Sequence, residues 1–471
     1  MLGKPVPMTR LGLGFLLVPF VAACSSTGNA GRPSDAGADS TKKDGSPSDG
    51  SVTDHQMVDE LPPDIDALPP PGTFCSLPGS VVFTPNGPEV VQGSDASTPS
   101  LAWLHLPVGF CAHYFGTSQM ARQLRFAPDG HLFVASPSMG TTGGSNNGTN
   151  AIVVMPDDNH DGVADSNVTF LSGLPATQGL MFTGGYFYFQ DLSTIKRVPF
   201  NNGDLSPSAA VELVTTVTVP QDSLHWTKVL DIAQDGTIYI TNGGSQSDTC
   251  ISTNPVRGSI LKLLPGGVTQ VVAKGFRNPI AMRCEPNHDV CLAAELSLDY
   301  SGPQGGREKI LQVHQGDDWG FPCCASQNIP YTGVTYSDTH QTPDCSGVQK
   351  ESAGFIIGET PFGLDFETGA GKWPAPWGGR VFVTLHGVFG SWTGARVVGI
   401  ALDPATGIPL PSDDLDGGNS PNMADFATGW DDGTLSHGRP ASITFAPDGR
   451  MFIGDDQQGA VIWIAPVPLK Q

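Results

Sequence analysis

Short apolar runs separated by tight polar turns dominate this chain, and the clearest example spans residues 224–244 (LHWTKVLDIAQDGTIYITNGG). Apolar residues 229–233 and 238–240 flank Asp235-Gly236, and an Asp-Gly pair between two β-forming runs is a strong signal for a β-hairpin. A strand rises about 3.3 Å per residue, so His225, which precedes the turn by a full strand, is expected at the end of the hairpin remote from the turn.

The same hairpin unit recurs along the chain. Residues 122–136 around Asp129-Gly130 and residues 439–455 around Asp448-Gly449 are close copies. Weaker copies are centred on Gly184-Gly185, Asn287 and Gly378-Gly379. The six turns are somewhat further apart than the period of roughly 40–50 residues typical of propeller blades. Because radially repeated sheets bury their faces against each other, the repeat predicts an all-β fold, a six-bladed β-propeller over residues 73–471.

The widest spacing between turns predicts an insertion around residues 298–358. Long loops in compact folds are usually functional when they are ordered, so we expect this one to wall one side of a pocket. Its segment Asp317-Asp-Trp-Gly-Phe-Pro322 has the composition of an ordered turn.

The first 72 residues have the features of an export segment followed by a linker. Lys4 and Arg10 precede an apolar run at 11–23 that is too short to span a membrane, as in a secretory signal peptide. Small residues before Cys24 are typical of a bacterial lipobox, so residues 1–23 are predicted to be a lipoprotein signal and Cys24 the acylated first residue. Residues 24–72, rich in Ser, Gly, Asp and Pro, are predicted to be a disordered tether. The protein is therefore expected to be anchored to a bacterial membrane, specifically the outer membrane, and to face the periplasm or the cell exterior. The alternative is an ordinary secretory signal, in which Cys24 has no role.

Composition narrows the classes of partner. The net charge of −22 excludes nucleic acid as a natural partner, since phosphate binding needs a basic surface. Eight cysteines besides Cys24 in an exported chain favour disulfides, and Cys284 with Cys291 and Cys75 with Cys111 are candidate pairs. A zinc site is the alternative, although no CxxC pair is present.

Residues 157–165 (DDNHDGVAD) carry oxygen ligands at alternate positions with glycine at the sixth, as in the first half of a calcium loop. The glutamate expected at the twelfth position is missing, because Val168 stands there. A calcium site and an ordinary Asp-rich connection between strands are both open.

Polar residues cluster at the strand ends remote from the predicted turns. Those before the first strand of a hairpin are Arg122, Gln178, His225, Arg277, Asn278 and Arg439. Those after the second strand are Ser136, Asp191, Asn242, Glu295, His386 and Asp455. These ends meet at one face of the ring, so several arginines in an acidic chain predict a pocket for a small polyanion, with His225 as a general base. Each residue also has an ordinary alternative, a hydrogen bond or an ion pair with a neighbour.

Several motifs occur in an order that resembles one family. They are His225-Trp-Thr, Gly275-Phe-Arg277-Asn278-Pro279, Gly320-Phe-Pro322, Phe362-Gly-Leu-Asp-Phe366, His386-Gly387 with Ser391-Trp392, Gly438-Arg439-Pro440 and Asp455-Asp456. Over residues 121–466 the chain resembles the pyrroloquinoline quinone (PQQ)-dependent sugar dehydrogenases, the glucose/sorbosone dehydrogenase group, and in particular the pyranose dehydrogenase propellers.

The resemblance implies a propeller that holds PQQ and a calcium ion on one face. It implies that His225 is the catalytic base and that Arg277, Asn278, Arg439 and Arg122 contact the cofactor. His386 and Trp392 fall in the segment where relatives line the cofactor pocket, and Glu295 leads into a metal-ligand loop and is the candidate metal ligand. The chain departs from the family pattern at residues 296–298 and 308–311, where Leu-Ser-Leu and Glu-Lys-Ile-Leu stand, so a propeller that kept the fold and lost the quinone is an open alternative.

The favoured function is therefore an exported quinoprotein that oxidises a sugar hydroxyl and passes the electrons to an acceptor that the sequence does not name. One alternative is a non-catalytic surface propeller that binds a glycan or a protein. Another is a lactonase-type hydrolase, for which Glu295, Asp191 and His386 would supply a metal cluster.

Overall fold

The computed structural model describes residues 73–93, 99–139, 148–217, 225–244, 257–297, 307–331, 343–388, 391, 393–413, 422–431 and 437–468. Its contacts divide the chain into two units, Met1–Gln56 and Met57–Gln471, and all described residues belong to the second. The predicted signal and tether, with Cys24, and the predicted site residue Trp392 lie outside the described residues. No helix among the described residues is long and apolar enough to cross a membrane.

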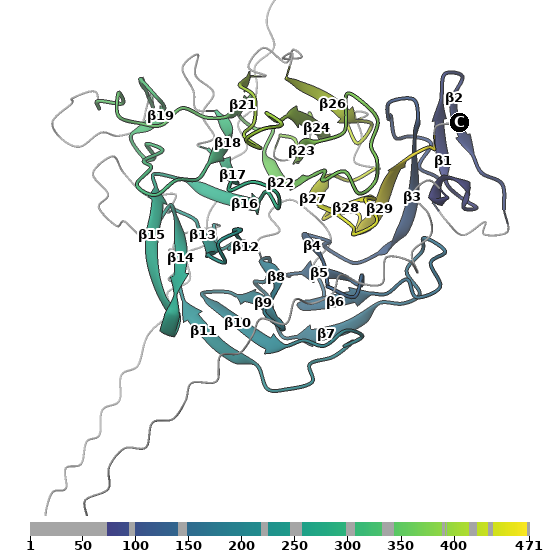
Figure 1. Cartoon of the computed structure of the whole chain (residues 1–471), viewed down its shortest axis with the longest axis horizontal. Helices are drawn as coiled ribbons and strands as arrows, with labels where there is room; N and C mark the ends of the chain where they lie inside the picture. The colour runs from purple at the N-terminus through teal and green to yellow at the C-terminus, as the bar shows by residue number, and fades with distance from the viewer. Residues whose placement is uncertain are drawn as a thin grey trace, which may run out of the picture. The chain divides into compact units, whose positions relative to one another are not determined.

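Six sheets surround a common centre, which confirms the predicted six-bladed β-propeller (Figure 1). In each blade the strands are given from the innermost outward. The first blade contains β4 (Gln123–Phe126), β5 (Leu132–Ser136), β6 (Ala151–Met155) and β7 (Val168–Ser172), and the second contains β8 (Leu180–Thr183), β9 (Tyr186–Asp191), β10 (Thr194–Pro199) and β11 (Glu212–Thr216). The third contains β12 (Leu230–Ile232), β13 (Ile238–Asn242), β14 (Ser259–Leu264) and β15 (Val268–Lys274), with the short helix η3 (Pro265–Gly267) between the last two, and the fourth contains β16 (Asn278–Cys284), β17 (Cys291–Leu296), β18 (Glu308–Gln312), β21 (Ala353–Phe355) and β25 (Ser412–Asp413). The fifth contains β22 (Pro361–Phe366), β23 (Arg380–Leu385), β24 (Arg396–Ala401) and β26 (Met423–Ala427), and the sixth β27 (Pro440–Phe445), β28 (Met451–Asp455) and β29 (Ala460–Pro466). The strands of these sheets are antiparallel except for the pair β21 and β25 at the edge of the fourth sheet.

All six predicted turns connect the two innermost strands of a blade. In the third blade Leu230 pairs with Ile240, and Gly236 takes the left-handed φ of +83° that the turn requires. The Asp235 carboxylate accepts the main-chain N–H of Thr237, so the Asp-Gly pair forms the turn as expected.

The core lies between blades rather than inside one of them. The innermost strands contact each other in ring order, from β4 through β8, β12, β16, β22 and β27 back to β4. Between the first two blades, for example, the rings of Phe133, Phe170 and Phe187 lie within 5.5 Å of one another, centroid to centroid. Neighbouring sheets therefore bury each other's faces, which is the reason that the repeat predicts the fold.

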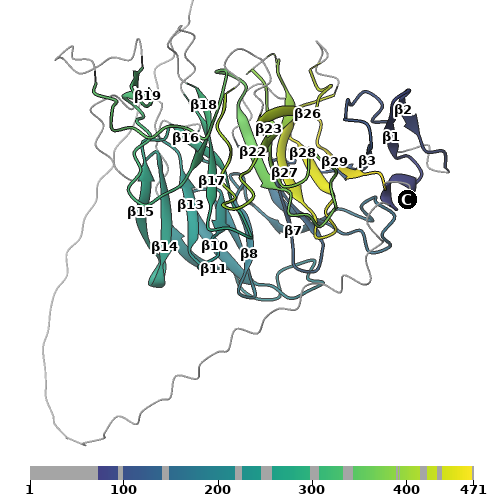
Figure 2. The same ribbon diagram turned by 45° about the horizontal axis from the view of Figure 1, so that its top comes forward.

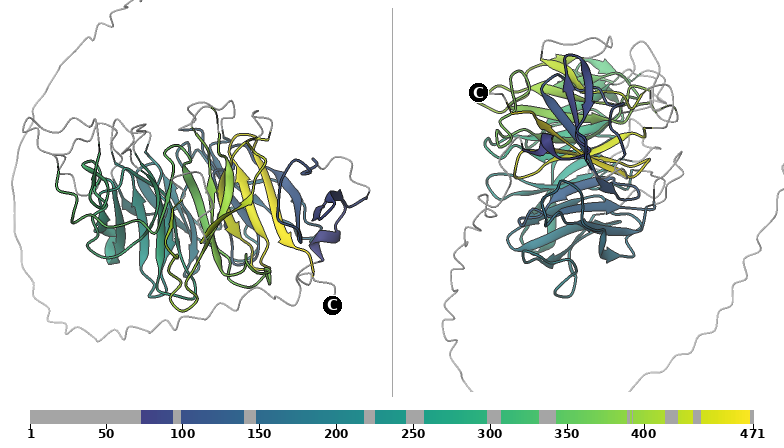
Figure 3. Two further views of the ribbon diagram at one scale, coloured as in Figure 1. Left: turned by 90° about the horizontal axis from the view of Figure 1, so that it is seen from above. Right: turned by 90° about the vertical axis from the view of Figure 1, so that its right-hand side faces the viewer.

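The ring is closed by strands from both ends of the described chain. Strand β3 (Phe110–Thr117) pairs with β29 in the sixth blade, and β1 (Val81–Thr84) and β2 (Gly87–Val90) extend the same sheet (Figure 2). The short helix η2 (Phe74–Ser76) is held there by the predicted disulfide Cys75–Cys111. The view from above shows the hairpin of β1 and β2, in purple, at the rim of the ring on the same side as the yellow β29 (Figure 3, left).

The predicted insertion at 298–358 belongs partly to the fourth blade itself. Strands β18 and β21 are the third and fourth strands of that blade, so the additional structure is the part between them, with the small sheet β19 (Cys324–Ser326) and β20 (Ile329–Pro330). Their apolar runs are short, which concealed them in the sequence.

The described cysteines are all disulfide-bonded. Cys284–Cys291 bridges the fourth blade's hairpin as predicted, and Cys324–Cys345 joins two parts of the insertion. No described thiol is left for the alternative zinc site.

Candidate functional site

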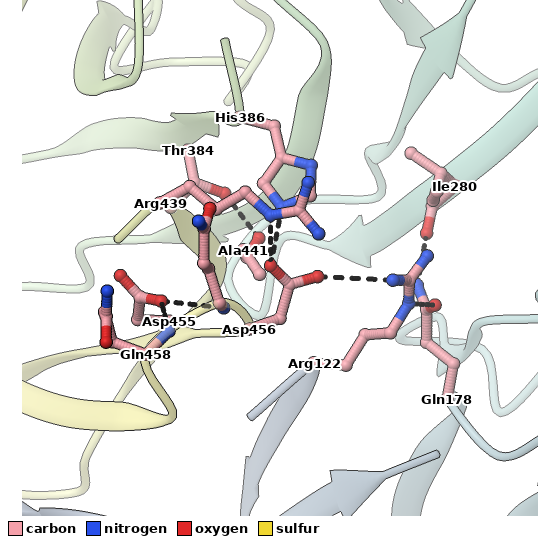
Figure 4. Close-up of polar contacts among 11 residues, drawn as sticks. Arg122, Gln178, Ile280, Thr384, His386, Arg439, Ala441, Asp455, Asp456 and Gln458 are labelled. Atoms are coloured by element: carbon pink, nitrogen blue, oxygen red, sulfur yellow. Dashed lines mark hydrogen bonds and ion pairs between the residues drawn. The ribbon is translucent and has the colours of Figure 1, made fainter. Parts of the chain in front are cut away.

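Predicted site residues from three blades converge on one buried carboxylate, Asp456, which follows β28 directly (Figure 4). Arg439 Nε donates to its Oδ1 at 2.6 Å, and His386 Nε2 lies 3.0 Å from the same oxygen. Arg122 Nη1 donates to Oδ2 at 3.2 Å. The Asp456 side chain is 0% exposed. We call Arg122, His386, Arg439 and Asp456 the strand-end cluster.

Protonation in this cluster follows from burial and from the two guanidinium groups. Burial alone would raise the pKa of Asp456, but Arg439, His386 and Arg122 hold it well below its usual range. Burial, helped by Arg439, lowers the pKa of His386 to about 4, so its ring is neutral at pH 7. Burial also lowers the pKa of Arg122 to about 10, which leaves it charged. Two cations therefore face one anion in this cluster.

Asp455, the residue predicted at this strand end, turns away from the cluster. Its Oδ1 accepts the main-chain N–H groups of Gln457 and Gln458, and burial raises its pKa to about 8. It is therefore mostly neutral at pH 7 and adds little negative charge to the strand-end cluster.

Arg122 links the cluster to the neighbouring blades. Its Nε donates to Gln178 Oε1 at 3.1 Å, and Gln178 Nε2 donates to the carbonyl of Ile280 at 3.1 Å. Its guanidinium lies 4.6 Å from the ring centroid of Phe362 and 5.6 Å from that of Trp226. Trp226 is the residue after His225, so the cluster reaches the predicted base through this ring.

His225 is buried and held against the fourth blade. Its Nδ1 lies 2.9 Å from the carbonyl of Gly244, whose own N–H donates to the carbonyl of Arg277 at 2.6 Å. A carbonyl only accepts, so Nδ1 carries the proton and the lone pair of the neutral ring is on Nε2. A lone pair on Nε2 is what the ring needs in order to abstract a proton from a substrate.

Asn278 lies beside His225. A Cβ added at Gly243 would lie 2.5 Å from His225 Cβ and 3.2 Å from Asn278 Oδ1, so only glycine allows this approach. Asn278 Oδ1 and Trp226 Nε1 are buried without a hydrogen-bond partner among the described residues. Two orphaned polar atoms at this end of the ring indicate that a polar group belongs there.

Arg277 is held by the end of β17. Its main-chain N–H donates to Glu295 Oε1 at 2.7 Å and its Nη1 donates to the carbonyl of Ser297 at 2.6 Å. The insertion packs against the same segment, because the N–H of Phe321 donates to the carbonyl of Gly275 at 2.8 Å and its ring borders Gly244. Part of the insertion therefore packs against the segment that carries Arg277.

The predicted metal ligand Glu295 does not fit that role. Its Oε2 lies 3.1 Å from Lys309 Nζ, and both side chains are buried. In residues 157–165 the Asp161 and Asp165 carboxylates and the Asn159 amide oxygen accept hydrogen bonds from within the loop, as in an Asp-rich connection between strands. The described part of the chain contains no group of three or more His, Cys, Asp or Glu residues arranged to hold a metal.

The carboxylate and histidine set of the hydrolase alternative is not assembled. Asp191 pairs with Lys196 at 2.6 Å, Glu295 with Lys309, and His386 with Asp456. These three predicted ligands have three different partners, so they share no metal position in the described structure.

Lys228 was not anticipated from the sequence. Its side chain is fully buried, its Nζ donates to Asn242 Oδ1 at 2.7 Å, and burial lowers its pKa to about 7. Its main-chain N–H donates to Gln190 Oε1, and Gln190 Nε2 donates to the carbonyl of Trp226. Gln190 thereby fixes the backbone that follows His225.

A second charged group lies near the turns, on the innermost strands of four blades. Arg125 Nη2 lies 2.7 Å from Asp231, and Arg283 Nη2 lies 3.2 Å from Asp365. Arg283 Nη1 is 3.9 Å from Asp231, and the N–H of Cys284 donates to the same carboxylate. A cavity of about 400 Å³ lies beside this group and is lined in part by Arg125 and Asp365. We call Arg125, Asp231, Arg283 and Asp365 the turn-end cluster.

Comparisons with known proteins agree with this fold. A family described as a domain of unknown function, DUF7133, matches residues 98–290, and no curated protein matches by sequence. A Trichoderma reesei structure of carbohydrate-active enzyme family AA12 is similar, with a TM-score of 0.63 and 16% identity over 80% of this chain and all of that one. The holo PQQ domain of Coprinopsis cinerea pyranose dehydrogenase gives 0.59 and 15% over 82% of this chain and 100% of that chain. The PQQ-bound aldose sugar dehydrogenase of Streptomyces coelicolor gives 0.51 and 15% over 77% and 99%. At these identities the similarity shows the propeller fold.

Proposed function

We propose that this protein is a PQQ-dependent oxidoreductase that oxidises a sugar hydroxyl, with His225 as the general base. The observation that carries the proposal is the convergence of guanidinium groups at the strand-end face. Among the described residues, Arg122 and Arg439 share one carboxylate, Asp456, and the Ser297 carbonyl holds the Arg277 guanidinium at the corresponding strand ends of the fourth blade. In a chain of net charge −22, such a concentration of guanidinium groups suits a small anion with several carboxylates.

PQQ fits these residues. It carries three carboxylates, for which Arg122, Arg439 and Arg277 would be the counter-charges, and the orphaned Asn278 Oδ1 and Trp226 Nε1 would gain polar partners. When bound, the quinone supplies the two-electron acceptor for the alcohol carbon. The chain's own residues hold the cofactor, exclude water and manage the proton.

His225 is the group suited to remove the hydroxyl proton. The Gly244 carbonyl fixes its tautomer, so Nε2 accepts the proton as the alcohol carbon becomes a carbonyl carbon. Burial among Trp226 and Asn278 keeps the base away from bulk water, which strengthens its electrostatic coupling to the substrate.

We further propose that the protein is exported and anchored by an acyl group on Cys24, with an external electron acceptor. Disulfides in the described chain support an oxidising compartment. Metabolic labelling with a fatty acid is expected to mark the wild-type protein and not the Cys24→Ser variant; equal labelling of both would contradict the anchor.

The test of the activity is reconstitution. Purified protein titrated with PQQ is expected to bind about one equivalent, followed by visible absorbance, and then to reduce a redox dye with one or more aldoses. Failure to bind the quinone would contradict the proposal and would favour a propeller that binds a glycan or a protein without catalysis.

His225→Gln separates binding from chemistry. Turnover is expected to fall by about 10²–10⁴-fold, the usual contribution of a general base, while quinone affinity stays within about threefold. The matched control is the exposed His105, whose replacement by Gln is expected to leave both quantities unchanged. Unaltered turnover in His225→Gln would remove His225 from the mechanism.

A further inference from the structure

Glu295 and Lys309 form a buried ion pair between two neighbouring strands of the fourth blade. They are directly opposite each other in the β17 and β18 register, and Glu295 Oε2 lies 3.1 Å from Lys309 Nζ. The exposed fractions of the two side chains are 0% and 1%. The sheet itself therefore fixes the pair, which is not an adaptable surface contact.

The pair is coupled to Arg277 through the other carboxylate oxygen. Glu295 Oε1 accepts the main-chain N–H of Arg277 at 2.7 Å, and Ser297, two residues further along, accepts from Arg277 Nη1. The N–H of Ser297 donates to Glu308 Oε2 at 2.8 Å. Both the backbone and the guanidinium of Arg277 thus depend on how the end of β17 is held.

A calcium ion and this ammonium could not both sit at Glu295 Oε2. Calcium binds carboxylate oxygens at about 2.3–2.6 Å, so an ion on Glu295 Oε2 would lie within about 6 Å of the ammonium nitrogen, which is 3.1 Å from the same oxygen. Repulsion between two cations that share one carboxylate in a buried site is strongly unfavourable. Lys309 also falls in the segment 308–311, where the chain departs from the family pattern.

We propose that the Lys309 ammonium is a built-in counter-cation that takes the place of a divalent metal at Glu295 and, through Glu295, positions Arg277. The role of Arg277 toward an anionic quinone rests on the proposed function. The exclusion of calcium from Glu295 stands on the ion pair alone.

The test measures the thermal unfolding midpoint of the full-length protein without quinone, with calcium or with a chelator. The wild type is expected to show no calcium response that depends on Glu295. Lys309→Ala, which leaves room for an ion beside the carboxylate, is expected to unfold at a lower temperature and to regain part of the loss with calcium. Lys309→Met keeps the volume filled and is expected to be destabilised without calcium rescue, while Lys350→Ala, at an exposed lysine of the same insertion, is the neutral control.

The double variant Glu295→Gln/Lys309→Ala is expected to lose the calcium response, which locates the ion at Glu295. A wild-type calcium response that disappears in Glu295→Gln would overturn the proposal, as would a Lys309→Ala variant that calcium leaves unchanged. If Lys309→Ala does not fold, the wild-type and Glu295→Gln titrations decide alone.

Quinone titration adds the readout for Arg277. In the presence of a chelator, Lys309→Ala is expected to bind PQQ about tenfold more weakly than the wild type, because the support of Arg277 through Glu295 is lost. With calcium, which replaces the ammonium at Glu295, the affinity is expected to return close to that of the wild type. Absence of quinone binding in the wild type would contradict the proposed function, whereas the unfolding midpoints would still decide the role of Lys309.

Discussion

The strand-end and turn-end clusters both combine arginine with aspartate from different blades, and they differ in charge balance. The turn-end cluster sets two arginines against two aspartates, each with a partner from another blade. The strand-end cluster sets two arginines and a neutral histidine around a single aspartate. The pairs of the turn-end cluster join the blades, whereas the strand-end cluster gathers two guanidinium groups at one carboxylate, which is the arrangement on which the proposed anion site rests. The ratio of arginines to aspartates, more than the residue types themselves, distinguishes the turn-end cluster from the candidate site at the strand ends.

Asp231→Asn is expected to have the largest effect on stability. It removes the carboxylate that Arg125 contacts at 2.7 Å, and breaking a buried pair typically costs about 3–5 kcal/mol. Urea unfolding measures this loss, while quinone affinity of the folded variant is expected to be unchanged.

The matched variant at the other end is Asp456→Asn, which removes the shared carboxylate of the strand-end cluster. It is expected to lose stability too but to bind the anionic quinone more tightly, because two guanidiniums lose their internal counter-charge. If Asp231→Asn instead altered quinone binding as much as Asp456→Asn, the distinction between the two ends would fail.

His386 gives the strand-end cluster a pH dependence of predictable sign. Its pKa is lowered from 6.5 to about 4 by burial, so below pH 6.5 the unfolded chain takes up the proton before the folded one does. Its contribution to the free energy of unfolding therefore falls as the pH drops from 6.5 to 4, by up to about 3 kcal/mol.

The measurement is the change in unfolding free energy between pH 7.5 and 4.5. His386→Gln is expected to lose less over this interval than the wild type, and His105→Gln, at an exposed position, is expected to behave as the wild type does. Parallel curves for wild type and His386→Gln would show that His386 does not stay neutral in the fold.

Arg439→Gln is expected to weaken quinone binding by roughly ten- to a hundredfold, since it removes one charge-assisted contact to the anion. Its effect on stability is expected to be modest, because Asp456 keeps Arg122 and His386. The comparison is Arg283→Gln in the turn-end cluster, which should weaken the fold and leave binding alone. Equal binding losses in the two variants would point to a general loosening of the ring.

The fold could be predicted because its signals are local. Each Asp-Gly or Gly-Gly turn between β-forming runs specifies a hairpin within about twenty residues, and six hairpins leave few architectures open. The outer strands of the fourth blade are not predicted by the sequence, because β18 is a short run that begins with two ionisable residues, Glu308 and Lys309, both buried, so its pattern does not alternate.

The site could be predicted only in part. The expectation that polar residues at the strand ends remote from the turns lie together is correct for Arg122, His386 and Arg439. The same expectation selects Asp455, whereas Asp456 makes the contacts. Neighbouring residues at a strand end point to different sides, so a shift of one position changes which carboxylate enters the cluster. The pairing of Glu295 with Lys309 depends on a register between strands that local sequence does not encode.

The pairing of β3 with β29 has a consequence for biosynthesis. Strand β3 is translated well before β29, because most of the propeller lies between them in the sequence, so the ring stays open until β29 has been made. Until then, β3 carries an unsatisfied edge that is open to other chains, and folding must await a contact of very long sequence separation. Deletion of β29 is therefore expected to cause aggregation rather than to give a smaller functional protein.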